Sequence, residues 1–219
     1  ECVGLVGESG GRKSTLTRAI LGLEDLQGGE VLIAGESVHH SAEARRKMQV
    51  VFQDPYGSFN PRHKVGRLIA EPFFSLGRKA MPDEIAEALV SVGLTAADQF
   101  KFIHEFSGGQ RQRIAIARAL IVKPELIILD EAVSALDVSV RAQILDLLTE
   151  LSISLGLTYL FITHDLTVVK AIADRVMVMK SGQIIEEGVT ANVFAAPQQD
   201  YTRKLIASAP HLPELEVVP

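Results

Sequence analysis

Residues 7–15, GESGGRKST, follow the apolar run ECVGLV and nearly fit a known phosphate-binding pattern. That pattern is a glycine, four residues of any kind, a second glycine, a lysine, and then serine or threonine. Counted from Gly7, the second glycine falls at position 12, where this chain has Arg12. A glycine-rich loop between a strand and a helix directs backbone N–H groups at an anion, and the helix N-terminus adds its dipole. Alone, the segment indicates either a phosphate site or a glycine-rich turn that caps a helix.

Side chains in this segment and in a later run suit a nucleotide that carries Mg²⁺. Lys13 would neutralise the outer phosphates, and the Ser14 hydroxyl would bind the metal. The run ELIILDEA ends an apolar strand with Asp130 and Glu131, at the edge where open α/β sheets bind ligands. Asp130 would reach Mg²⁺ through water, and Glu131 would orient or deprotonate an attacking water. The alternative is an acidic pair that starts a helix, but the presence of Lys13 and Ser14 favours the nucleotide site.

A second glycine-rich helix start lies in the run FSGGQRQR. Ser107 is a favoured N-cap residue, and Gly108 and Gly109 allow the backbone to approach a ligand closely. The helix that follows points its N-terminus at an anion, as the first one does. One terminal phosphate cannot easily use both helix ends of a single subunit, so we expect a head-to-tail dimer in which this end meets the partner's nucleotide. The alternative is a capped helix with surface arginines.

Hydrophobic patterning predicts the elements that hold these residues. Short apolar runs alternate with helical patterns, which predicts an α/β fold with right-handed crossovers. The runs LIIL and YLFI are apolar on both faces, as in a mostly parallel sheet covered by helices. We expect strands at residues 3–6, 48–52, 126–129, 159–163 and 176–179, and helices at residues 14–23, 109–121, 138–155 and 166–173.

Three stretches depart from this alternation. Residues 28–35 (GGEVLIAG) predict a short strand, antiparallel to its neighbours. Residues 55–106 contain helical patterns without a convincing strand, which we interpret as a helical subdomain. We expect this subdomain to be inserted into a core formed by residues 1–54 and 107–219, and the core and subdomain together to form one domain. Residues 197–210 predict a last short helix before an irregular tail.

Composition limits the classes of protein. The chain has 219 residues, 47% hydrophobic and 22% charged, which suits one globular domain with a sizeable core. The net charge of -5 argues against nucleic-acid binding by phosphate neutralisation. Cys2 is the only cysteine, which excludes an internal disulfide and a zinc cluster of thiolates. No apolar run approaches the roughly 20 residues that cross a bilayer. Because Glu1 stands directly before an apolar run, we expect the natural protein to continue upstream.

Together, these motifs resemble those of the ATP-binding subunit of ABC transporters over nearly the whole chain. FSGGQ is similar to the family's LSGGQ signature, with Phe106 in place of leucine. VVFQD carries Gln53 where the family has a glutamine that contacts Mg²⁺ and the attacking water. SALD ends in Asp137, which matches the family's D-loop. FITHD supplies His164, which resembles the switch histidine that holds the γ-phosphate and water beside Glu131.

The resemblance implies a P-loop nucleotide hydrolase fold, with ATP and Mg²⁺ as cofactors and two subunits that enclose two ATP molecules. It implies catalytic roles for Glu131, His164 and Gln53, and Mg²⁺ binding by Ser14, Gln53 and Asp130. The expected nucleotide contacts come from the phosphate loop, the signature and the D-loop, namely Gly7, Glu8, Ser9, Gly10, Gly11, Arg12, Lys13, Ser14, Thr15, Ser107, Gly108, Gly109, Gln110 and Asp137.

Spacing and end segments narrow the resemblance to one branch. The short spacing between Gln53 and Ser107 matches transporters, whereas DNA-repair relatives carry much longer insertions. DPYGSFNPRHKV and residues 197–210 resemble the dipeptide and oligopeptide importers. The resemblance therefore implies a peripheral protein at the cytoplasmic face of the membrane that powers import of peptides or similar solutes. Its implied partners are a second ATP-binding subunit, identical or homologous, transmembrane permease subunits and, indirectly, a solute-binding protein, with no nucleic acid.

Some positions depart from the family's pattern. Ala132 and Val133 replace the usual Pro-Thr but leave both carboxylates in place. Arg12 replaces a glycine, and its Cβ would strain the loop by about 1–3 kcal/mol. That strain would lower nucleotide affinity roughly 5- to 150-fold, and the added positive charge would offset part of the loss. Two alternatives stay open: a degenerate or weakly active subunit with a structural role, and a non-transport ABC ATPase such as a translation factor or a repair enzyme.

Overall fold

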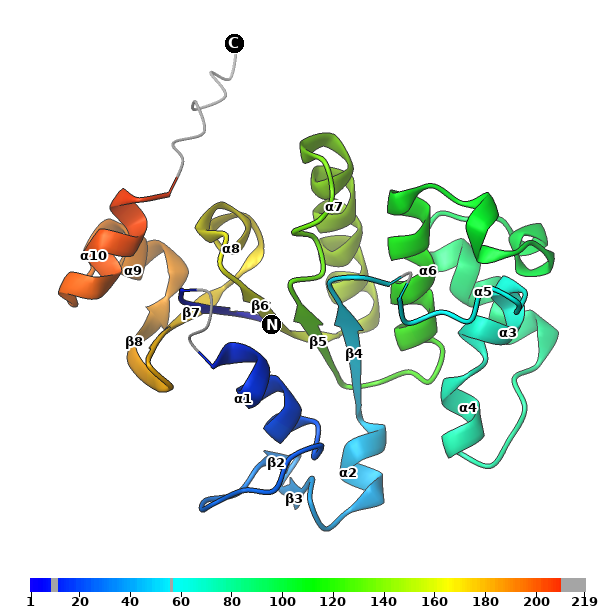
Figure 1. The fold of residues 1–219 in the computed structure, drawn as a ribbon, viewed down its shortest axis with the longest axis horizontal. Helices are drawn as coiled ribbons and strands as arrows, with labels where there is room; N and C mark the ends of the chain where they lie inside the picture. The colour runs from blue at the N-terminus through cyan, green and yellow to red at the C-terminus, as the bar shows by residue number, and fades with distance from the viewer. Residues whose placement is uncertain (9–11, 56, 210–219) are drawn as a thin grey trace.

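The computed structural model describes residues 1–8, 12–55 and 57–209 (Figure 1). Within these residues, six strands form one sheet in the order β4-β5-β6-β1-β7-β8. Neighbours are parallel from β4 to β7, and β8 is antiparallel to β7. This confirms the predicted mostly parallel sheet. The strands are β1 Cys2–Val6, β4 Met48–Phe52, β5 Leu126–Asp130, β6 Thr158–Thr163, β7 Arg175–Lys180 and β8 Gln183–Val189.

Helices connect and cover the strands. Figure 1 shows α9 and α10 beside β8 at one end of the sheet and the short helices α3 to α5 beside α6 at the other. In the described part of the chain, no helix has the length and hydrophobicity of a membrane span. The helices are α1 Lys13–Ile20, α2 Ala42–Arg46, α3 Val65–Ile69, α4 Pro72–Ser75, α5 Pro82–Ser91, α6 Gly108–Leu120, α7 Val138–Leu155, α8 Leu166–Ile172, α9 Thr190–Ala195 and α10 Asp200–Ala207.

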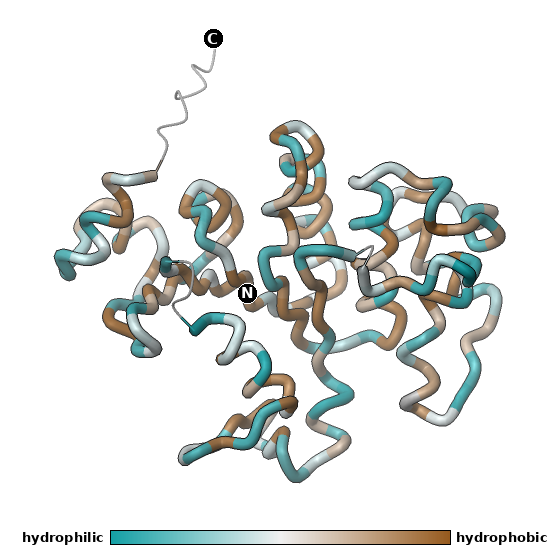
Figure 2. The backbone as a smooth tube through the Cα atoms, viewed as in Figure 1, coloured by the Kyte–Doolittle hydropathy of each residue, from teal (hydrophilic) through white to brown (hydrophobic). Residues whose placement is uncertain are grey.

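The central strands are buried on both faces, as their unbroken apolar runs predict. In β5, Ile127 and Leu129 lie in the large core cluster that also holds residues of α6, α7 and α8. Ile128, between them in sequence, lies in a second cluster against α1, where it joins Leu5 and Ile162. Successive side chains of a strand point to opposite faces, so both faces need an apolar cover. Figure 2 shows the hydrophobic residues gathered along these strands.

Gly4 of β1 lies so close to α8 that a side chain would not fit. A Cβ at Gly4 would lie 2.6 Å from Val169 Cγ1 and 3.3 Å from Ala173 Cβ. We expect Gly4→Ala to lower the free energy of unfolding by about 1–3 kcal/mol, because overpacking displaces the helix from the sheet. Chemical denaturation measures this loss.

The double variant Gly4→Ala/Val169→Ala is the control for that prediction. It removes the methyl groups that meet the new Cβ, so it should be more stable than the sum of the two single losses implies. Strict additivity of the two losses would contradict the close contact between β1 and α8.

Two short strands form a separate antiparallel pair, β2 Leu32–Ile33 and β3 Glu36–Ser37. They account for the short antiparallel strand predicted in residues 28–35. The turn between them holds Ala34 and Gly35, both at positive φ. This small β part lies beside α1 and α2, as Figure 1 shows, and is not paired with the main sheet.

Residues 57–106 contain helices but no strand. Their only β pairing in the structure is an isolated bridge between Lys64 and Phe102. Beyond α3, α4 and α5, the segment forms short 3₁₀ turns at Ala96–Phe100 and Ile103–Glu105. Leu68, Leu89 and Ile114 share one buried cluster, which joins the segment to α6. The division into a core and an inserted subdomain stays a prediction, because a continuous cluster does not define a boundary.

The sequence pattern does not predict β8 or α9, and the helix expected to reach residue 23 ends at Ile20. Gly22 has a φ of 69°, which stops α1 in the left-handed region. β8 is an edge strand whose residues are all exposed or half-buried, so it lacks the apolar run that marks the central strands.

Candidate nucleotide-binding site

The candidate site lies at the carboxyl edge of the parallel strands. Val6 at the end of β1 pairs with Thr163 at the end of β6. Asp130 at the end of β5 pairs with Phe52 of β4 and with Ile162 of β6. The residues that follow these ends are the sequence-predicted Gly7, Gln53, Glu131 and His164. The register therefore brings together residues that are far apart in the chain, at the edge where open sheets bind ligands.

The phosphate loop starts with a glycine that the packing requires. A Cβ at Gly7 would lie 2.3 Å from the backbone oxygen of Met179 in β7. Lys13, the first residue of α1, is buried, and its Nζ donates to the carbonyl oxygens of Gly7 at 2.7 Å and Glu8 at 3.0 Å. The side chain of Lys13 thus folds back under the loop, and its ammonium bonds the backbone at the start of the loop. Ser9, Gly10 and Gly11, which were also predicted to contact the nucleotide, lie outside the described residues.

Two half-buried carboxylates act on the charge of the lysine. Burial lowers the pKa of the Lys13 ammonium, and the carboxylates of Glu131 and Asp130 partly oppose this change. Burial also raises the pKa of the Asp130 carboxyl, which a hydrogen bond from Thr17 partly offsets. Desolvation is the main cause of both pKa shifts, so burial destabilises the charged forms of Lys13 and Asp130. A bound phosphate would stabilise the ammonium, and a bound cation would stabilise the carboxylate. Such shifts of opposed groups at one edge are typical of functional sites.

Arg12 has a backbone conformation that favours glycine. Its φ is 68° and its ψ is 17°, in the left-handed region, and its side chain does not cap α1. The left-handed region costs a residue with a Cβ roughly 1–2 kcal/mol. The side chain lies beside the turn between β7 and β8: a Cβ added at Gly182, in that turn, would be 3.4 Å from Arg12 Cδ. The unusual residue therefore strains the loop through its own backbone, in addition to any effect on a bound phosphate.

Glu131 and His164 form a hydrogen-bonded pair. The Nδ1 of His164 lies 2.8 Å from Glu131 Oε1, and it donates when the carboxylate is ionised. The Thr163 hydroxyl donates to Glu131 Oε2 at 3.3 Å. Glu131 itself has a φ of 52°, a strained value that functional sites often hold. Two donors thus fix the carboxylate, while the exposed imidazole remains open to a ligand.

The signature residues form a second group, at the start of α6. The Ser107 Oγ accepts from the Gln110 backbone N–H at 3.3 Å, and the Gln110 side chain accepts from the Ser107 N–H at 3.0 Å. This reciprocal capping box orders the helix start. Ser107, Gly108 and Gln110 are exposed, so they are accessible to a partner. A Cβ at Gly109 would lie 2.5 Å from Val140 Cγ1, which explains the need for glycine against α7.

The remaining predicted residues flank these two groups. Gln53 follows β4 directly and is exposed. Asp137 caps α7, and its Oδ1 accepts from the Val140 backbone N–H at 3.0 Å. Ser14 and Thr15 occupy the first turn of α1, and both are exposed. The site roles assigned to all these residues stay predictions.

The oxygen donors at the sheet edge fit Mg²⁺ that arrives with a nucleotide. Among the residues that the structure describes, no three His, Cys, Asp or Glu side chains gather to hold a metal. Mg²⁺ does not need such a cage, because it is usually held by one or two carboxylates together with substrate phosphates. The hydroxyl of Ser14, the amide oxygen of Gln53 and the carboxylate of Asp130 are donors of this kind.

Tyr201 belongs to the surroundings of the loop, although the sequence pattern does not indicate it. Its hydroxyl oxygen accepts from the Glu8 backbone N–H at 3.1 Å. The Lys180 ammonium lies 5.0 Å from the centre of its ring. No local pattern could have linked positions so far apart in the chain. The last helix of the described residues, α10, thereby contacts the phosphate loop.

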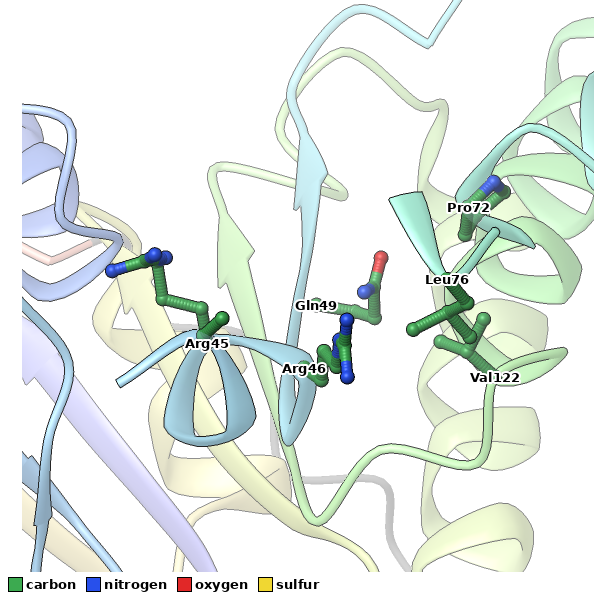
Figure 3. Close-up of a pocket in the computed structure, with 7 residues that line it drawn as sticks. Arg45, Arg46, Gln49, Pro72, Leu76 and Val122 are labelled. Carbon is green, nitrogen blue, oxygen red and sulfur yellow. The ribbon is translucent and has the colours of Figure 1, made fainter. Parts of the chain in front are cut away.

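A groove of about 270 Å³ lies between α2, β4 and α4, away from the sheet edge. Figure 3 shows Arg46 and Gln49 on one side and Leu76 and Val122 on the other. On α4, Phe73 is buried in the core, whereas 62% of Phe74 is exposed. The groove thus combines basic and apolar side chains.

Comparisons with known proteins show the family of the chain. Residues 1–134 match the family model described as ABC transporter. Over 99% of its length, the chain is 48% identical to the peptidoglycan transport ATP-binding protein YejF of Agrobacterium fabrum, of which it covers 41%. Over 95% of its length, it is 47% identical to the dipeptide transport ATP-binding protein DppF of Escherichia coli, of which it covers 65%. The chain thus spans less than two thirds of each of these curated relatives.

A solved structure supports the fold. The chain resembles cbiO1 from Clostridium perfringens, described as part of the ABC transporter complex cbiONQ, with a TM-score of 0.78 and 32% sequence identity. The match covers 90% of this chain and 80% of the other. Together with the curated relatives, it confirms both the predicted fold class and the predicted resemblance to peptide importers.

Proposed function

Because this chain belongs to the ABC transporter family, we propose that it binds and hydrolyses ATP to power the import of peptides or similar solutes. The observation that carries the proposal is the 2.8 Å hydrogen bond between Glu131 and His164 at the sheet edge that also holds Lys13 and Asp130. A carboxylate oriented by an imidazole suits the positioning of an attacking water. A buried ammonium beside it suits phosphate charge.

Each residue has a defined task in this mechanism. Lys13 neutralises the outer phosphates from inside the loop, and the backbone N–H groups at the start of α1 bind phosphate oxygens. Glu131 orients the attacking water and accepts its proton, while His164 holds the carboxylate in place. Ser14, Asp130 and Gln53 would hold Mg²⁺, which when bound neutralises charge on the β- and γ-phosphates.

The partners of the chain follow from its exposed surfaces. The capped, exposed start of α6 suits the nucleotide of a second ATP-binding subunit, identical or homologous. The groove between α2, β4 and α4 suits a segment of a transmembrane permease subunit, because it offers basic and apolar side chains together. Docking there would place the protein peripherally at the cytoplasmic face of a membrane. A solute-binding protein would take part indirectly, and the names of YejF and DppF support peptide-like solutes.

A weakly active subunit with a structural role is the second candidate, and the backbone of Arg12 favours it. A φ of 68° at a residue with a Cβ strains the loop that must grip the phosphates. The two candidates differ in turnover, not in fold. Reconstitution of the complete protein with its permease subunits in vesicles separates them, because only the first gives steady ATP hydrolysis coupled to peptide uptake.

We expect Arg12→Gly to raise the affinity for Mg-ATP by roughly 5- to 150-fold, because glycine adopts the left-handed region without strain. Titration of the complete protein with a fluorescent ATP analogue measures the change. Lys123→Gly is the matched control, since Lys123 also has a positive φ, of 53°, but follows α6 away from the loop. Equal affinities of Arg12→Gly and the unmodified protein would contradict a role for Arg12 in nucleotide binding.

A further inference from the structure

Arg141, in the first turn of α7, joins two segments of the candidate site. Its Nη1 donates to Asp165 Oδ2 at 2.7 Å, and its Nη2 donates to the carbonyl oxygen of Leu136 at 3.3 Å. Leu136 belongs to the SALD run, and Asp165 directly follows His164. Both charged side chains are 24% exposed, so solvent screens their attraction only in part. One guanidinium thus holds two loops that come from different strands.

Asp165 connects Arg141 to the pair formed by Glu131 and His164. Its Oδ1 accepts from the Thr167 backbone N–H at 2.9 Å and so caps α8. Its own backbone N–H donates to the Thr163 hydroxyl oxygen at 3.1 Å. That hydroxyl donates to Glu131 Oε2, as described above. Hydrogen bonds therefore run without a gap from Leu136 through Arg141, Asp165 and Thr163 to the carboxylate.

The same turn of α7 also touches the signature. Val140 lies so close to Gly109 that only a glycine fits there. Asp137 caps the turn and fixes its orientation. The first turn of α7 is therefore in contact with both groups of predicted site residues, the signature on one side and the loop of His164 on the other.

We propose that Arg141 is a positioning residue for ATP hydrolysis, which keeps His164 and Glu131 aligned through Asp165 and links that alignment to the D-loop and the signature. This inference rests on the proposed function. A guanidinium suits the task because its rigid fork donates to two acceptors at once, whereas the single ammonium of a lysine does not offer this geometry. Loss of the pair leaves Asp165 without its cationic partner and frees the loop that carries His164.

The test is a double-mutant cycle in the complete protein. Arg141→Met removes the charge at similar length, and Asp165→Asn removes the ion pair but keeps a good N-cap residue for α8. We expect each variant to lower kcat about tenfold while the Kd for Mg-ATP changes less than about twofold. The double variant should be no slower than either single one, because both remove the same link. Arg141→Lys should recover only part of the rate.

Arg78→Met is the matched control, since it breaks another arginine–carboxylate pair, with Glu84 at 2.9 Å, that lies outside the site. It should leave kcat unchanged. A merely structural role for Arg141 would instead raise the Kd and lower both the rate and the stability, which denaturation of each variant would reveal. Additive losses in the cycle, or an unchanged kcat in Arg141→Met, would overturn the proposal.

A readout that needs no turnover separates this inference from the proposed function. The ring nitrogen signals of His164 in nuclear magnetic resonance report its hydrogen bond to Glu131. They should change in Arg141→Met and Asp165→Asn but not in Arg78→Met. If the unmodified protein fails to hydrolyse ATP, the proposed function fails, and the His164 signals still decide whether Arg141 positions the ring. Unchanged signals in both variants would overturn the inference.

Discussion

Glu131→Gln is expected to lower kcat for ATP hydrolysis by about 10²- to 10⁴-fold while Mg-ATP still binds. The carboxylate is held at 2.8 Å from His164 Nδ1 and at 3.3 Å from the Thr163 hydroxyl, in the geometry of an oriented base. Glutamine keeps the size and most of the hydrogen-bonding capacity but does not accept a proton from water. Single-turnover measurements with radiolabelled ATP separate this chemical step from product release.

Glu125→Gln is the control for this variant, because Glu125 precedes the same strand but is exposed at its opposite end, near Lys47. It should leave the rate unchanged. We also expect the Glu131→Gln protein to form a more persistent dimer with ATP, since the nucleotide is not consumed. A Glu131→Gln protein that hydrolyses ATP at nearly the full rate would show that another group positions the water.

Lys13→Met has the second large expected effect, a loss of Mg-ATP affinity of roughly 30- to 5000-fold, which corresponds to about 2–5 kcal/mol. The ammonium is buried and bonds only loop carbonyl oxygens among the contacts described for it, so it is poised for a stronger anionic partner. Methionine has a similar length without charge, and burial favours an uncharged side chain at this position. The variant should therefore fold normally.

Isothermal titration with Mg-ATP and with Mg-ADP tests the origin of that loss. Because Lys13 is expected to contact the outer phosphates, the loss should be larger for ATP than for ADP. Lys170→Met, on the exposed face of α8, is the control and should bind both nucleotides normally. Equal losses for the two nucleotides would contradict the assignment of Lys13 to the outer phosphates.

Elements with a strong local pattern could be predicted closely. The strand Met48–Phe52 and the helix Val138–Leu155 have the predicted bounds. The first is an apolar run, and the second starts at the cap Asp137 and ends at Gly156 in the left-handed region. Both signals lie within the segment itself. β8 was missed because an edge strand with few buried residues carries no comparable signal.

The site could be predicted as a set of residues but not as a geometry. The family resemblance implied that His164 acts beside Glu131, but their direct hydrogen bond follows from the pairing of β5 with β6. No motif in the sequence indicates Arg141, since its partner Asp165 lies 24 positions further along the chain. The left-handed backbone of Arg12 likewise depends on the loop as a whole. Long-range contacts of this kind leave no periodic signal in one sequence.

The hydrogen bond between Tyr201 and Glu8 bears on how the protein is made. It joins residues 193 positions apart, from the loop after the first described strand to the last described helix. The ribosome delivers Glu8 among the first described residues and Tyr201 among the last, and domains generally fold as units during synthesis. The amide of Glu8 therefore gains this partner only after every strand of the sheet has been synthesised. A nascent chain that stalls before residue 201 would therefore lack this contact between the phosphate loop and the last described helix.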